Sequence, residues 1–418
     1  MSSRVLTSIV HDTVSIMPGP TLGADSMPGA MLGADSIMPG ATLGADSIMP
    51  GATLGILGGG QLGRMFTIAA RTMGYHVMVL DPDAASPAGQ MADVHLQADY
   101  GDLDALRKLG QSCAAITTEF ENIPAASLIE LATYCRVSPS ANAVAIVQDR
   151  IHEKTWLREH AFATAPFAII ANASELEAAL VLTGAPALLK VSRFGYDGKG
   201  QAKVENVDQA RLAFEEFGGQ ACVLEGLVTL DCEVSVVLAR DDAGQCALFP
   251  VAENQHQNGI LELSIVPARV SDALTRQACE LACEVADKLA YVGVMAVEFF
   301  ITNGQLLINE IAPRPHNSGH YTLDACVTSQ FEQQVRVLAG LPLGDTRLLS
   351  PVAMVNILGD RWLNRTPNWQ ALLAHPAIKL HLYGKTSART GRKMGHFNVL
   401  DADAATALAL AQQMRESL

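Results

Sequence analysis

The sequence predicts a protein of mixed class, an α/β region followed by an α+β region, and three observations support this. Residues 53–83 (TLGILGGGQLGRMFTIAARTMGYHVMVLDPD) follow the order strand, glycine turn, helix, strand. From about residue 222 onward, apolar strand-like segments follow one another with one long helical pattern, 272–289, among them. This order favours antiparallel strands over a continued βαβ array. The 418 residues are enough for two or three domains with full cores.

The composition excludes several classes of protein. Apolar residues make up 49% of the chain and charged residues 17%, and no uninterrupted apolar stretch approaches 18 residues, so we expect a soluble globular protein. The formal net charge of −14 argues against a nucleic-acid or membrane partner, although a locally basic pocket can still bind a small anion. Eight cysteines without a CxxC pair indicate a reduced, cytoplasmic setting.

The first 52 residues differ from the rest of the chain. The unit SIMPGPTLGAD begins at Ser15 and recurs with small changes at Ser26, Ser36 and Ser47. Because this unit has no apolar face to bury, we expect residues 1–52 to be disordered and dispensable. The last copy runs directly into ILGGGQLG, so a tandem duplication upstream of an ordinary start near Met49 explains the pattern. A targeting peptide is the alternative.

A glycine motif follows the first predicted strand. Gly58, Gly60 and Gly63 fit GxGxxG, and Asp81 ends the second predicted strand. By pattern this is a Rossmann-like unit, and the direct inference is an NAD(P) site with Asp81 on the ribose. The motif is weak alone, because it also packs any helix tightly against a parallel strand.

The next predicted strand, 113–120, leads to two carboxylates, Glu119 and Glu121. Carboxylates at the carboxyl end of a parallel strand face the ligand crevice of such sheets. A solvated helix start is an equally good explanation for Glu121 and a weaker one for Glu119.

Residues 190–201 (KVSRFGYDGKGQ) open from an apolar strand-like run into a loop with three glycines and two lysines. Glycines let backbone N–H groups approach a polyphosphate, and lysines supply the counter-charge. The spacing is not that of a P-loop, because Gly200 follows Lys199 where Ser or Thr would stand. The segment is therefore either another kind of phosphate cradle or a polar hairpin loop.

A second informative feature is the hairpin VGVMAVEFFITNGQLLINEIAPRP. Glu298 lies on its first strand, and Asn309 and Glu310 end the second. Carboxylates in an apolar sheet are costly to bury unless something pairs with them, and Mg²⁺ bridging phosphates is a natural partner. Two ordinary edge-strand glutamates are the alternative.

The loop of this hairpin decides whether the two glutamates meet. A two-residue Asn-Gly turn would pair Glu298 with Asn309 and place Glu310 on the opposite face. A three-residue loop with Gly304 left-handed would pair Ala296 with Glu310, so that both carboxylates share a face. We predict this bulged loop; carboxylates on opposite faces would exclude the metal site.

Two further segments are rich in polar groups. IAPRPHNSGHYT crowds hydrogen-bonding side chains into a turn made rigid by two prolines, which suggests substrate positioning. KTSARTGRKMGHFNVL holds four cations in an otherwise acidic chain, Lys385, Arg389, Arg392 and Lys393. Beside a pocket these cations would hold a substrate phosphate, and otherwise they form a solvated loop.

Six segments occur in one order along the chain: KVSRFGYDGKGQ, EGLVTLDCE, NQHQNGIL, VEFF, NEIAPRPHNSGH and GRKMGH. Together they resemble the N5-carboxyaminoimidazole ribonucleotide synthetase (PurK) family of ATP-grasp enzymes, over residues 53–418. HNSGH and GRKMGH add family identity to the general ATP-grasp pattern. The resemblance implies an ATP-grasp fold with a Rossmann-like N-terminal domain (53–149), a central ATP-grasp domain (150–345) and a small C-terminal domain (346–418).

The resemblance also implies which residues bind ATP and metal. The ATP-binding set is Arg150, Lys190, Gly195, Tyr196, Asp197, Gly198, Lys199, Gly200, Gln201, Glu225, Gly226, Leu227, Val228, Glu233, His256, Asn309 and Glu310. Lys190 would reach the phosphates, the backbone of 225–228 would read adenine, and Glu233 would bind the ribose. Glu298 and Glu310 would hold Mg²⁺, or Mn²⁺ in its place.

The reaction implied is carboxylation of the exocyclic amine of 5-aminoimidazole ribonucleotide in purine biosynthesis, with ATP and bicarbonate as co-substrates. Carboxyphosphate would be the intermediate, and ADP and phosphate the by-products. The implied substrate contacts are Gln61, Leu62, His316, Asn317, Ser318, Lys385, Arg392 and Lys393, with Lys385 and Arg392 at the phosphate. Arg314 would clamp the transferring phosphoryl group. Asp197 and Lys393 would orient the amine, and Glu119 and Tyr196 would shuttle its proton.

The expected partners are therefore small molecules and, from the family, a second copy in a cytoplasmic homodimer. In this family the glycine motif faces the ribonucleotide and binds no nicotinamide. Three alternatives stay open: a dehydrogenase, the formate-dependent glycinamide ribonucleotide transformylase of the same superfamily, and an inactive paralogue that serves as a binding subunit.

Overall fold

A parallel five-stranded sheet forms the N-terminal region of the computed structural model, which describes residues 43–44, 46–195, 198–363 and 366–418. Its strands, in spatial order, are β3 (Val94–Leu96), β2 (His76–Leu80), β1 (Thr53–Leu57), β4 (Ala115–Thr118) and β5 (Arg136–Val137). The connecting helices are α1 (Gln61–Thr72), α2 (Leu103–Ser112) and α3 (Ala125–Leu131). Every strand pair is parallel, so the predicted Rossmann-like unit is confirmed.

The glycine motif serves the packing of α1 against β1. Gly58 has a φ of +100°, which disfavours other residues. A Cβ on Gly63 would lie 2.6 Å from the Gly58 carbonyl oxygen. Both glycines are therefore explained by the turn and by the close approach of helix and strand.

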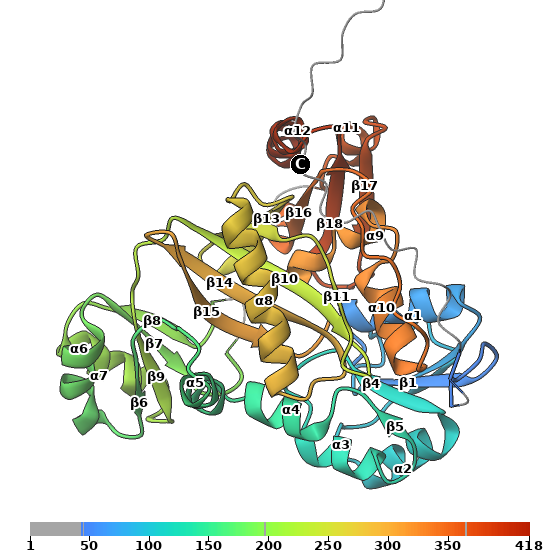
Figure 1. Ribbon diagram of the computed structural model, residues 1–418, viewed down its shortest axis with the longest axis horizontal. Coiled ribbons are helices and arrows are strands. Elements are labelled where there is room, and N and C mark those ends of the chain that lie inside the picture. Colours follow the sequence, from blue (N-terminus) through green and yellow to red (C-terminus); the bar gives the residue numbers. More distant parts are fainter. Residues whose placement is uncertain (1–42, 45, 196–197, 364–365) are drawn as a thin grey trace, which may run out of the picture. The chain divides into compact units, whose positions relative to one another are not determined.

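A nine-stranded antiparallel sheet runs through much of the remaining chain (Figure 1). Its order is β15-β14-β10-β12-β13-β16-β18-β17, and β11 pairs with β10. The bounds are β10 (Cys232–Arg240), β11 (Cys246–Leu248), β12 (Ala252–Gln257), β13 (Ile260–Val266), β14 (Gly293–Thr302), β15 (Gln305–Ala312), β16 (Val352–Leu358), β17 (Ile378–Leu382) and β18 (Lys393–Leu400). Because β16 pairs with β13, the third block predicted from the sequence extends this sheet and has no separate sheet among the described residues.

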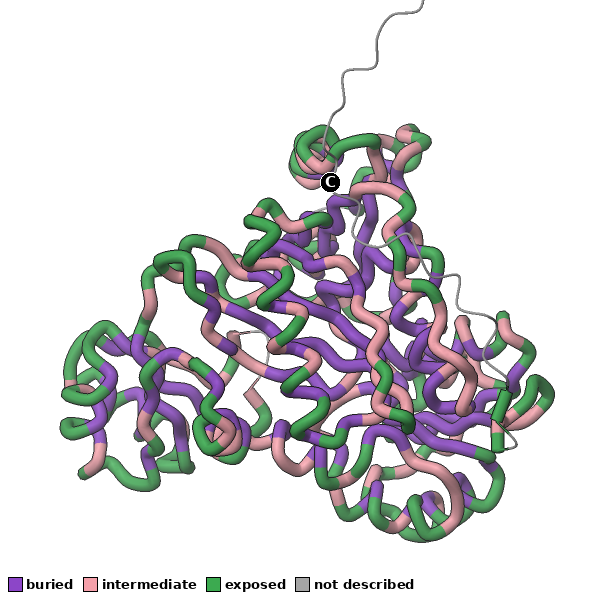
Figure 2. The backbone as a smooth tube through the Cα atoms, in the orientation of Figure 1, coloured by how far each residue is buried: buried purple, intermediate pink, exposed green. Residues whose placement is uncertain are grey.

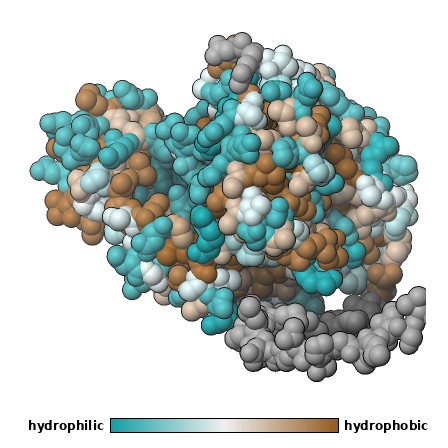
Figure 3. Space-filling view, turned by 90° about the horizontal axis from the view of Figure 1, so that it is seen from above, coloured by the Kyte–Doolittle hydropathy of each residue, from teal (hydrophilic) through white to brown (hydrophobic). Residues whose placement is uncertain are grey.

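A smaller antiparallel sheet carries the glycine-rich loop. Its order is β6 (Phe167–Ile170), β9 (Cys222–Gly226), β7 (Ala187–Val191) and β8 (Gln201–Val204). Figure 3 shows the part of the surface that this sheet supports at the left, set off by a hollow lined mainly with hydrophilic residues. The remaining helices are α4 (Ala141–Val147), α5 (Arg150–Glu159), α6 (Leu176–Thr183), α7 (Val207–Glu216), α8 (Asp272–Lys288), α9 (Thr322–Ala325), α10 (Gln330–Leu338), α11 (Trp369–Leu373) and α12 (Ala404–Ser417), with 3-10 turns at η1 (Ala173–Glu175), η2 (Asn317–Gly319) and η3 (Gly359–Trp362).

Helices α8 and α10 cover opposite faces of the nine-stranded sheet. Along β10, Val236 and Leu238 belong to the core that contains α8, whereas Val237 and Ala239 belong to the core that contains Val337 of α10. This alternation with a period of two is expected for a strand buried on both faces. Figure 2 shows the resulting continuous burial along the central strands.

Part of the last repeat copy belongs to the folded chain. The Ile48 amide donates to the Ala339 carbonyl at 2.8 Å, and the Tyr75 hydroxyl donates to the Ile48 carbonyl at 2.7 Å. The Ile48 side chain packs at the edge of the core beneath α1. The prediction of disorder through residue 52 is therefore wrong for residues 47–52, because this segment finds backbone partners and an apolar contact. Residues 1–42 and 45 of the predicted extension lie outside the described residues.

Within the described parts of the chain, no helix is both long and apolar enough to cross a membrane. All eight cysteines are free thiols.

Ile48→Ala should destabilise the protein, because it removes apolar packing from the edge of the parallel sheet. Ile48 is half-buried, so we expect a loss of about 1–2 kcal/mol in the free energy of unfolding, measured in urea. Met49 is 45% exposed, and Met49→Ala should change the free energy of unfolding by less than about 0.5 kcal/mol. Parental stability in both variants would show that this segment does not support the fold.

Candidate active site

A β-bulge in the β14–β15 hairpin places two glutamates on one face of the nine-stranded sheet. The hairpin turns through Asn303 and Gly304, with φ of 50° and 70°, so the loop has two residues and not the predicted three. Pairing is regular near the turn and then shifts by one residue at Asn309. As a result Glu298 lies directly opposite Glu310.

The prediction that the two carboxylates share a face is confirmed, but by a different route. We predicted Ala296 opposite Glu310, and Ala296 instead lies opposite Ala312. One extra residue within β15 has the same effect as one extra residue in the loop, because either shifts the alternation of side chains by one position.

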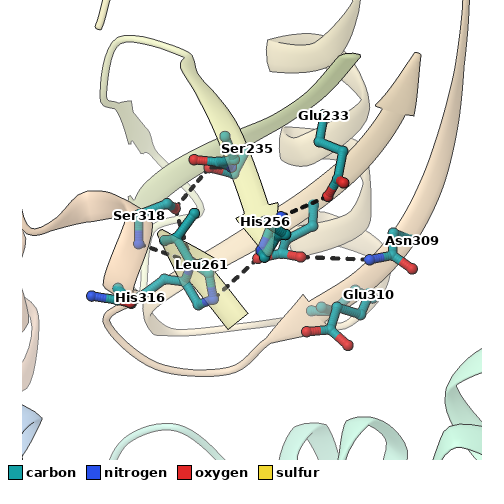
Figure 4. Close-up of polar contacts among 12 residues, drawn as sticks. Glu233, Ser235, His256, Leu261, Asn309, Glu310, His316 and Ser318 are labelled. Atoms are coloured by element: carbon teal, nitrogen blue, oxygen red, sulfur yellow. Dashed lines mark hydrogen bonds and ion pairs between the residues drawn. The ribbon is translucent and has the colours of Figure 1, made fainter. Parts of the chain in front are cut away.

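Glu298 is buried among polar partners. Its Oε1 lies 3.2 Å from His316 Nε2, and Asn309 Nδ2 donates to its Oε2 at 3.5 Å (Figure 4). Burial, and then the charge of Glu310, raise the pKa of Glu298 to about 7. Burial would also raise the pKa of Glu310, but the charges of Arg150 and Lys190 outweigh it and hold that pKa below its ordinary value. The two carboxylates repel each other, and a bound cation would relieve this.

Three cations, two of them buried, stand near the carboxylate pair. Arg150 Nη1 lies 3.2 Å from Glu310 Oε2. Lys190 Nζ donates to Glu225 Oε2 at 2.9 Å, and Lys154 Nζ lies 3.6 Å from the same oxygen. Burial alone would raise the pKa of Glu225, but Lys190 and Lys154 lower it to about 2. Glu225 therefore stays ionised and holds Lys190 at the end of β7.

The predicted adenine and ribose contacts lie on the two antiparallel sheets. Gly226 ends β9, and a Cβ there would lie 2.4 Å from the Thr183 carbonyl oxygen, so glycine is required. Leu227 follows and is exposed. Glu233 Oε2 lies 2.8 Å from His256 Nδ1 (Figure 4). Burial would lower the pKa of His256, but the hydrogen bond to Glu233 and the charges of Glu298 and Glu233 outweigh burial. The pKa of His256 therefore lies above its ordinary value.

The glycine-rich loop joins two antiparallel strands. Lys190 pairs with Gln201 across β7 and β8, so in topology the segment is the hairpin loop that the sequence left open. Gly198 and Gly200 have φ of +76° and +69°. A Cβ on Gly198 would lie 2.5 Å from the carbonyl oxygen of Asn258, so the loop contacts the β12–β13 turn closely. Two predicted site residues, Tyr196 and Asp197, lie outside the described residues.

Glu119 fills the N-terminus of α1. The amides of Gly60 and Gly63 donate to its two carboxylate oxygens, the second at 2.7 Å. Burial raises the pKa of Glu119 against these hydrogen bonds. Asp81 accepts from the Gly59 amide at 2.6 Å. A dinucleotide pyrophosphate binds at this helix end in nicotinamide enzymes, so the dehydrogenase alternative fails because the protein's own carboxylate occupies the place.

Arg314 connects the turn after β15 to the parallel sheet. Its Nε donates to Glu121 Oε2 at 2.5 Å. Burial would raise the pKa of Glu121, but the charge of Arg314 lowers it. Of the two explanations that the sequence offered for Glu121, the solvated helix start is therefore excluded.

Polar side chains of the HNSGH segment are buried, and Ser318 contacts Ser235 of the nine-stranded sheet. Ser318 is fully buried, and Asn317 exchanges two hydrogen bonds with Asn356, at 3.0 and 2.7 Å. The Asn317 and Ser318 side chains thus find hydrogen-bond partners within the protein, and the contact of these two residues with the substrate stays a prediction. His316 Nδ1 lies 2.8 Å from Ser318 Oγ, so the motif orients the imidazole whose other nitrogen faces Glu298 (Figure 4).

The basic C-terminal run reaches the start of α1. Lys385 Nζ donates to Gln61 Oε1 at 2.6 Å and to the Lys393 carbonyl at 2.7 Å. Arg392 Nη1 donates to the Ser387 hydroxyl at 2.7 Å. Lys385 thus brings together Gln61 and Lys393, two other predicted substrate contacts that lie far apart in the sequence. The side chain of Leu62, a further predicted contact, is buried in a small apolar cluster.

Comparison with known proteins identifies the family. Three family models match in succession: a ribonucleotide synthetase preATP-grasp domain over 51–148, an ATP-grasp domain over 155–331 and a phosphoribosylaminoimidazole carboxylase C-terminal domain over 352–410. The N5-carboxyaminoimidazole ribonucleotide synthase of Bacillus subtilis is 46% identical over 348 residues, which cover 82% of this chain and 90% of that protein. This chain belongs to the N5-carboxyaminoimidazole ribonucleotide synthase family.

Solved structures of this synthase family have the same fold. A synthetase in complex with ADP matches with a TM-score of 0.85 and 42% identity, over 89% of this chain and 98% of that one. The synthase of Aspergillus clavatus, in complex with ADP and 5-aminoimidazole ribonucleotide, matches with a TM-score of 0.81 and 30% identity, over 88% and 98%. The predicted ATP-grasp fold, with its N-terminal and C-terminal domains, is confirmed.

Sequence reasoning missed two residues of the site, Glu153 and Lys154. Both are at most 2% exposed. They lie in the helical segment RIHEKTWLRE, whose charge pattern is that of a solvated helix. The available signal was indirect: Arg150 was already assigned to ATP, and residues three and four positions along a helix lie on the same face.

Glu298→Gln should gain stability relative to the parent as the pH rises, in protein free of metal and nucleotide. In the folded parent the pKa of Glu298 is about 7, above its ordinary value of 4.5, so the folded state binds the proton more tightly than the unfolded chain does. The free energy of unfolding of the parent therefore falls as the pH rises from about 4.5 to about 7. Glutamine does not ionise and escapes this loss. Urea unfolding at pH 5 and pH 8 should show a relative gain on the order of 1 kcal/mol at the higher pH.

Exposed Glu284 on α8 supplies the control for this experiment. The stability of Glu284→Gln relative to the parent should not depend on pH. A relative gain for Glu298→Gln at pH 5 instead of pH 8 would contradict the account of its environment.

Proposed function

We propose that this chain carboxylates the exocyclic amine of 5-aminoimidazole ribonucleotide, with ATP and bicarbonate as co-substrates and ADP and phosphate as by-products. The observation that carries the proposal is the bulged pair Glu298 and Glu310, with Arg150 and Lys190 beside it. In a site for a nucleoside triphosphate, carboxylates bind the metal ion and cationic side chains bind the phosphates, and this cluster offers both kinds of group. The family supplies the acceptor, because its members carry the synthase name.

The residues of the bulge fit a magnesium ion. Glu298 and Glu310 face each other, and the buried Oδ1 of Asn309 has no hydrogen-bond partner. Among the described residues no third carboxylate, histidine or cysteine completes a metal-binding group, which suits Mg²⁺ because it takes few protein ligands and fills its shell with phosphate oxygens and water. When bound, Mg²⁺ or Mn²⁺ would neutralise charge on the transferring phosphoryl group.

The protein's own cations would hold the rest of the triphosphate. Lys190, now paired with Glu225, would exchange part of that contact for phosphate oxygens, and Arg150 would do the same from Glu310. The backbone of 225–228 would bind adenine. Glu233 would accept from the ribose hydroxyls, with its carboxylate oriented by His256.

The ribonucleotide would lie between the start of α1 and the basic C-terminal run. Lys385 and Arg392 supply positive charge for its phosphate, and Gln61 already contacts Lys385. The charge of Lys393 acts to lower the pKa of Glu298, against burial and Glu310, which raise it. This electrostatic link between the basic run and the carboxylate pair supports placing the acceptor amine in the same site as the phosphoryl group.

Bicarbonate is a poor electrophile, so its oxygen must first take the γ-phosphoryl group of ATP, with ADP leaving. The amine nitrogen then attacks the carboxyl carbon, or the CO₂ that it releases, and phosphate departs. Arg314, fixed by Glu121, would neutralise the phosphoryl oxygens during the first step. The amine loses one proton, which Glu119 would accept if one of its bonds to α1 opens.

We further propose that the protein works in the cytoplasm as a homodimer. All its cysteines are free thiols, which a reducing compartment maintains. The dimer is the expectation from the family.

Mixing the purified chain with Mg-ATP and 5-aminoimidazole ribonucleotide, with and without bicarbonate, tests the proposed reaction. ADP release should depend on the ribonucleotide. Formate-dependent release with glycinamide ribonucleotide would instead identify a transformylase, and no release would identify an inactive paralogue.

Glu310→Gln should lower kcat by at least about 100-fold, because it removes the charge of a carboxylate that would hold the metal ion at the transferring phosphoryl group. The protein should remain folded by circular dichroism. Glu262→Gln is the matched control. Glu262 on β13 forms an ion pair with Arg415 on α12, which is not a residue of the proposed site. Full activity of Glu310→Gln would refute the metal role.

A further inference from the structure

We infer that Glu153 and Lys154 of α5 are positioning residues that hold the bulge at Asn309 and so fix where Glu298, Glu310 and Lys190 stand. The inference deepens the proposed function and rests on it for the identity of the ligands. It concerns two side chains that contact no substrate.

The two side chains bind backbone groups on either side of Glu310. The Ile311 amide donates to Glu153 Oε1 at 2.6 Å, and Lys154 Nζ donates to the Asn309 carbonyl at 2.8 Å. A bulge leaves backbone groups of the extra residue without partners in the ladder, and a buried unpaired group is costly. Lys154 therefore supplies a partner for the extra residue itself, and Glu153 supplies one for the Ile311 amide, two residues further along the edge strand β15.

Lys154 also connects the bulge to the phosphate-binding lysine. Its Nζ lies 3.6 Å from Glu225 Oε2, which accepts from Lys190 at 2.9 Å. One ammonium group thus bridges β15 of the large sheet and β9 of the small sheet. When Lys190 turns toward a phosphate, Lys154 remains as the partner that keeps the buried Glu225 charge compensated.

Helix α5 is fixed well enough to act as a support. Its N-cap Asp149 accepts from the Ile151 amide at 2.9 Å and from the hydroxyl of Ser192, two residues after Lys190. The Arg150 amide donates to the Ser192 carbonyl at 2.9 Å. On its other side, Leu157 belongs to the core beneath α8. The helix is therefore anchored to both sheets that it joins.

Burial separates positioning from direct binding. The Lys154 side chain is 1% exposed and the Glu153 residue 2%, so neither presents surface to a ligand. Arg150, on the same face of the helix, is 20% exposed at its side chain and can reach one. The helix thus carries one ligand-facing cation and two supports behind it.

The test compares Glu153→Ala and Glu153→Gln with the exposed control Glu159→Ala on the same helix. The first readout is amide hydrogen exchange in the 305–312 segment of the nucleotide-free protein. Glu153→Ala should speed exchange there, whereas Glu153→Gln retains an oxygen acceptor for Ile311 and should exchange like the parent. The second readout is the affinity for Mn²⁺ in the presence of ADP, measured by electron paramagnetic resonance.

Glu153→Ala should weaken Mn²⁺ binding by about 10- to 100-fold, the range found when residues that support metal ligands are removed. Glu153→Gln should recover most of this loss, and Glu159→Ala should match the parent. Lys154→Met should weaken ADP binding as well as Mn²⁺ binding. It also removes one of the two lysines that compensate the buried charge of Glu225, so that Lys190 is less able to turn from Glu225 toward a phosphate. Circular dichroism should show that all variants are folded.

Parental exchange and parental Mn²⁺ affinity in Glu153→Ala would overturn the inference, and so would an equal loss in Glu153→Gln. Neither readout uses the ribonucleotide or bicarbonate, so failure of the proposed reaction leaves both interpretable. If the parent chain binds no Mn²⁺ with ADP, the proposed metal role fails, and hydrogen exchange alone decides whether Glu153 supports the bulge.

Discussion

The β-bulge at Asn309 is the constraint on which the rest of the site depends. With a regular two-residue hairpin, Glu298 would pair with Asn309, and Glu310 would point to the other face of the sheet. The extra residue restores the match between the two carboxylates and leaves backbone groups that require partners. Helix α5 supplies a partner for the carbonyl of the extra residue through Lys154, and one for the nearby Ile311 amide through Glu153.

Charge compensation governs the surroundings of the bulge. Glu225 lies between two lysines, and Glu310 faces Arg150. Removing Lys190 or Lys154 would leave the buried Glu225 charge without one of its partners, which is costly. In the proposed function, an anionic nucleotide and its metal would take over part of these protein pairs. Glu298 is the exception, because burial and its neighbour Glu310 raise its pKa to about 7, and it gains most from a bound cation.

Patterns local in sequence predicted much of this molecule, and contacts between distant segments account for what they missed. The glycine motif and apolar runs predicted the Rossmann-like unit, and the six ordered segments predicted the fold and the family. Periodicity could not reveal that Glu119 caps α1 or that Ser318 turns inward, because each depends on a partner strand or turn far along the chain. The shared face of Glu298 and Glu310 was predicted, yet the position of the extra residue was not, since α5 stabilises it from outside the hairpin.

A double-mutant cycle on Mn²⁺ affinity in the presence of ADP tests the central claim most directly. The four proteins are the parent, Glu298→Gln, Glu310→Gln and the double variant. If the bulge exists to bring both carboxylates to one ion, either single change loses most of the binding, and the double variant loses at least about 1 kcal/mol less than the sum. Additive losses, or parental affinity in either single variant, would contradict the account.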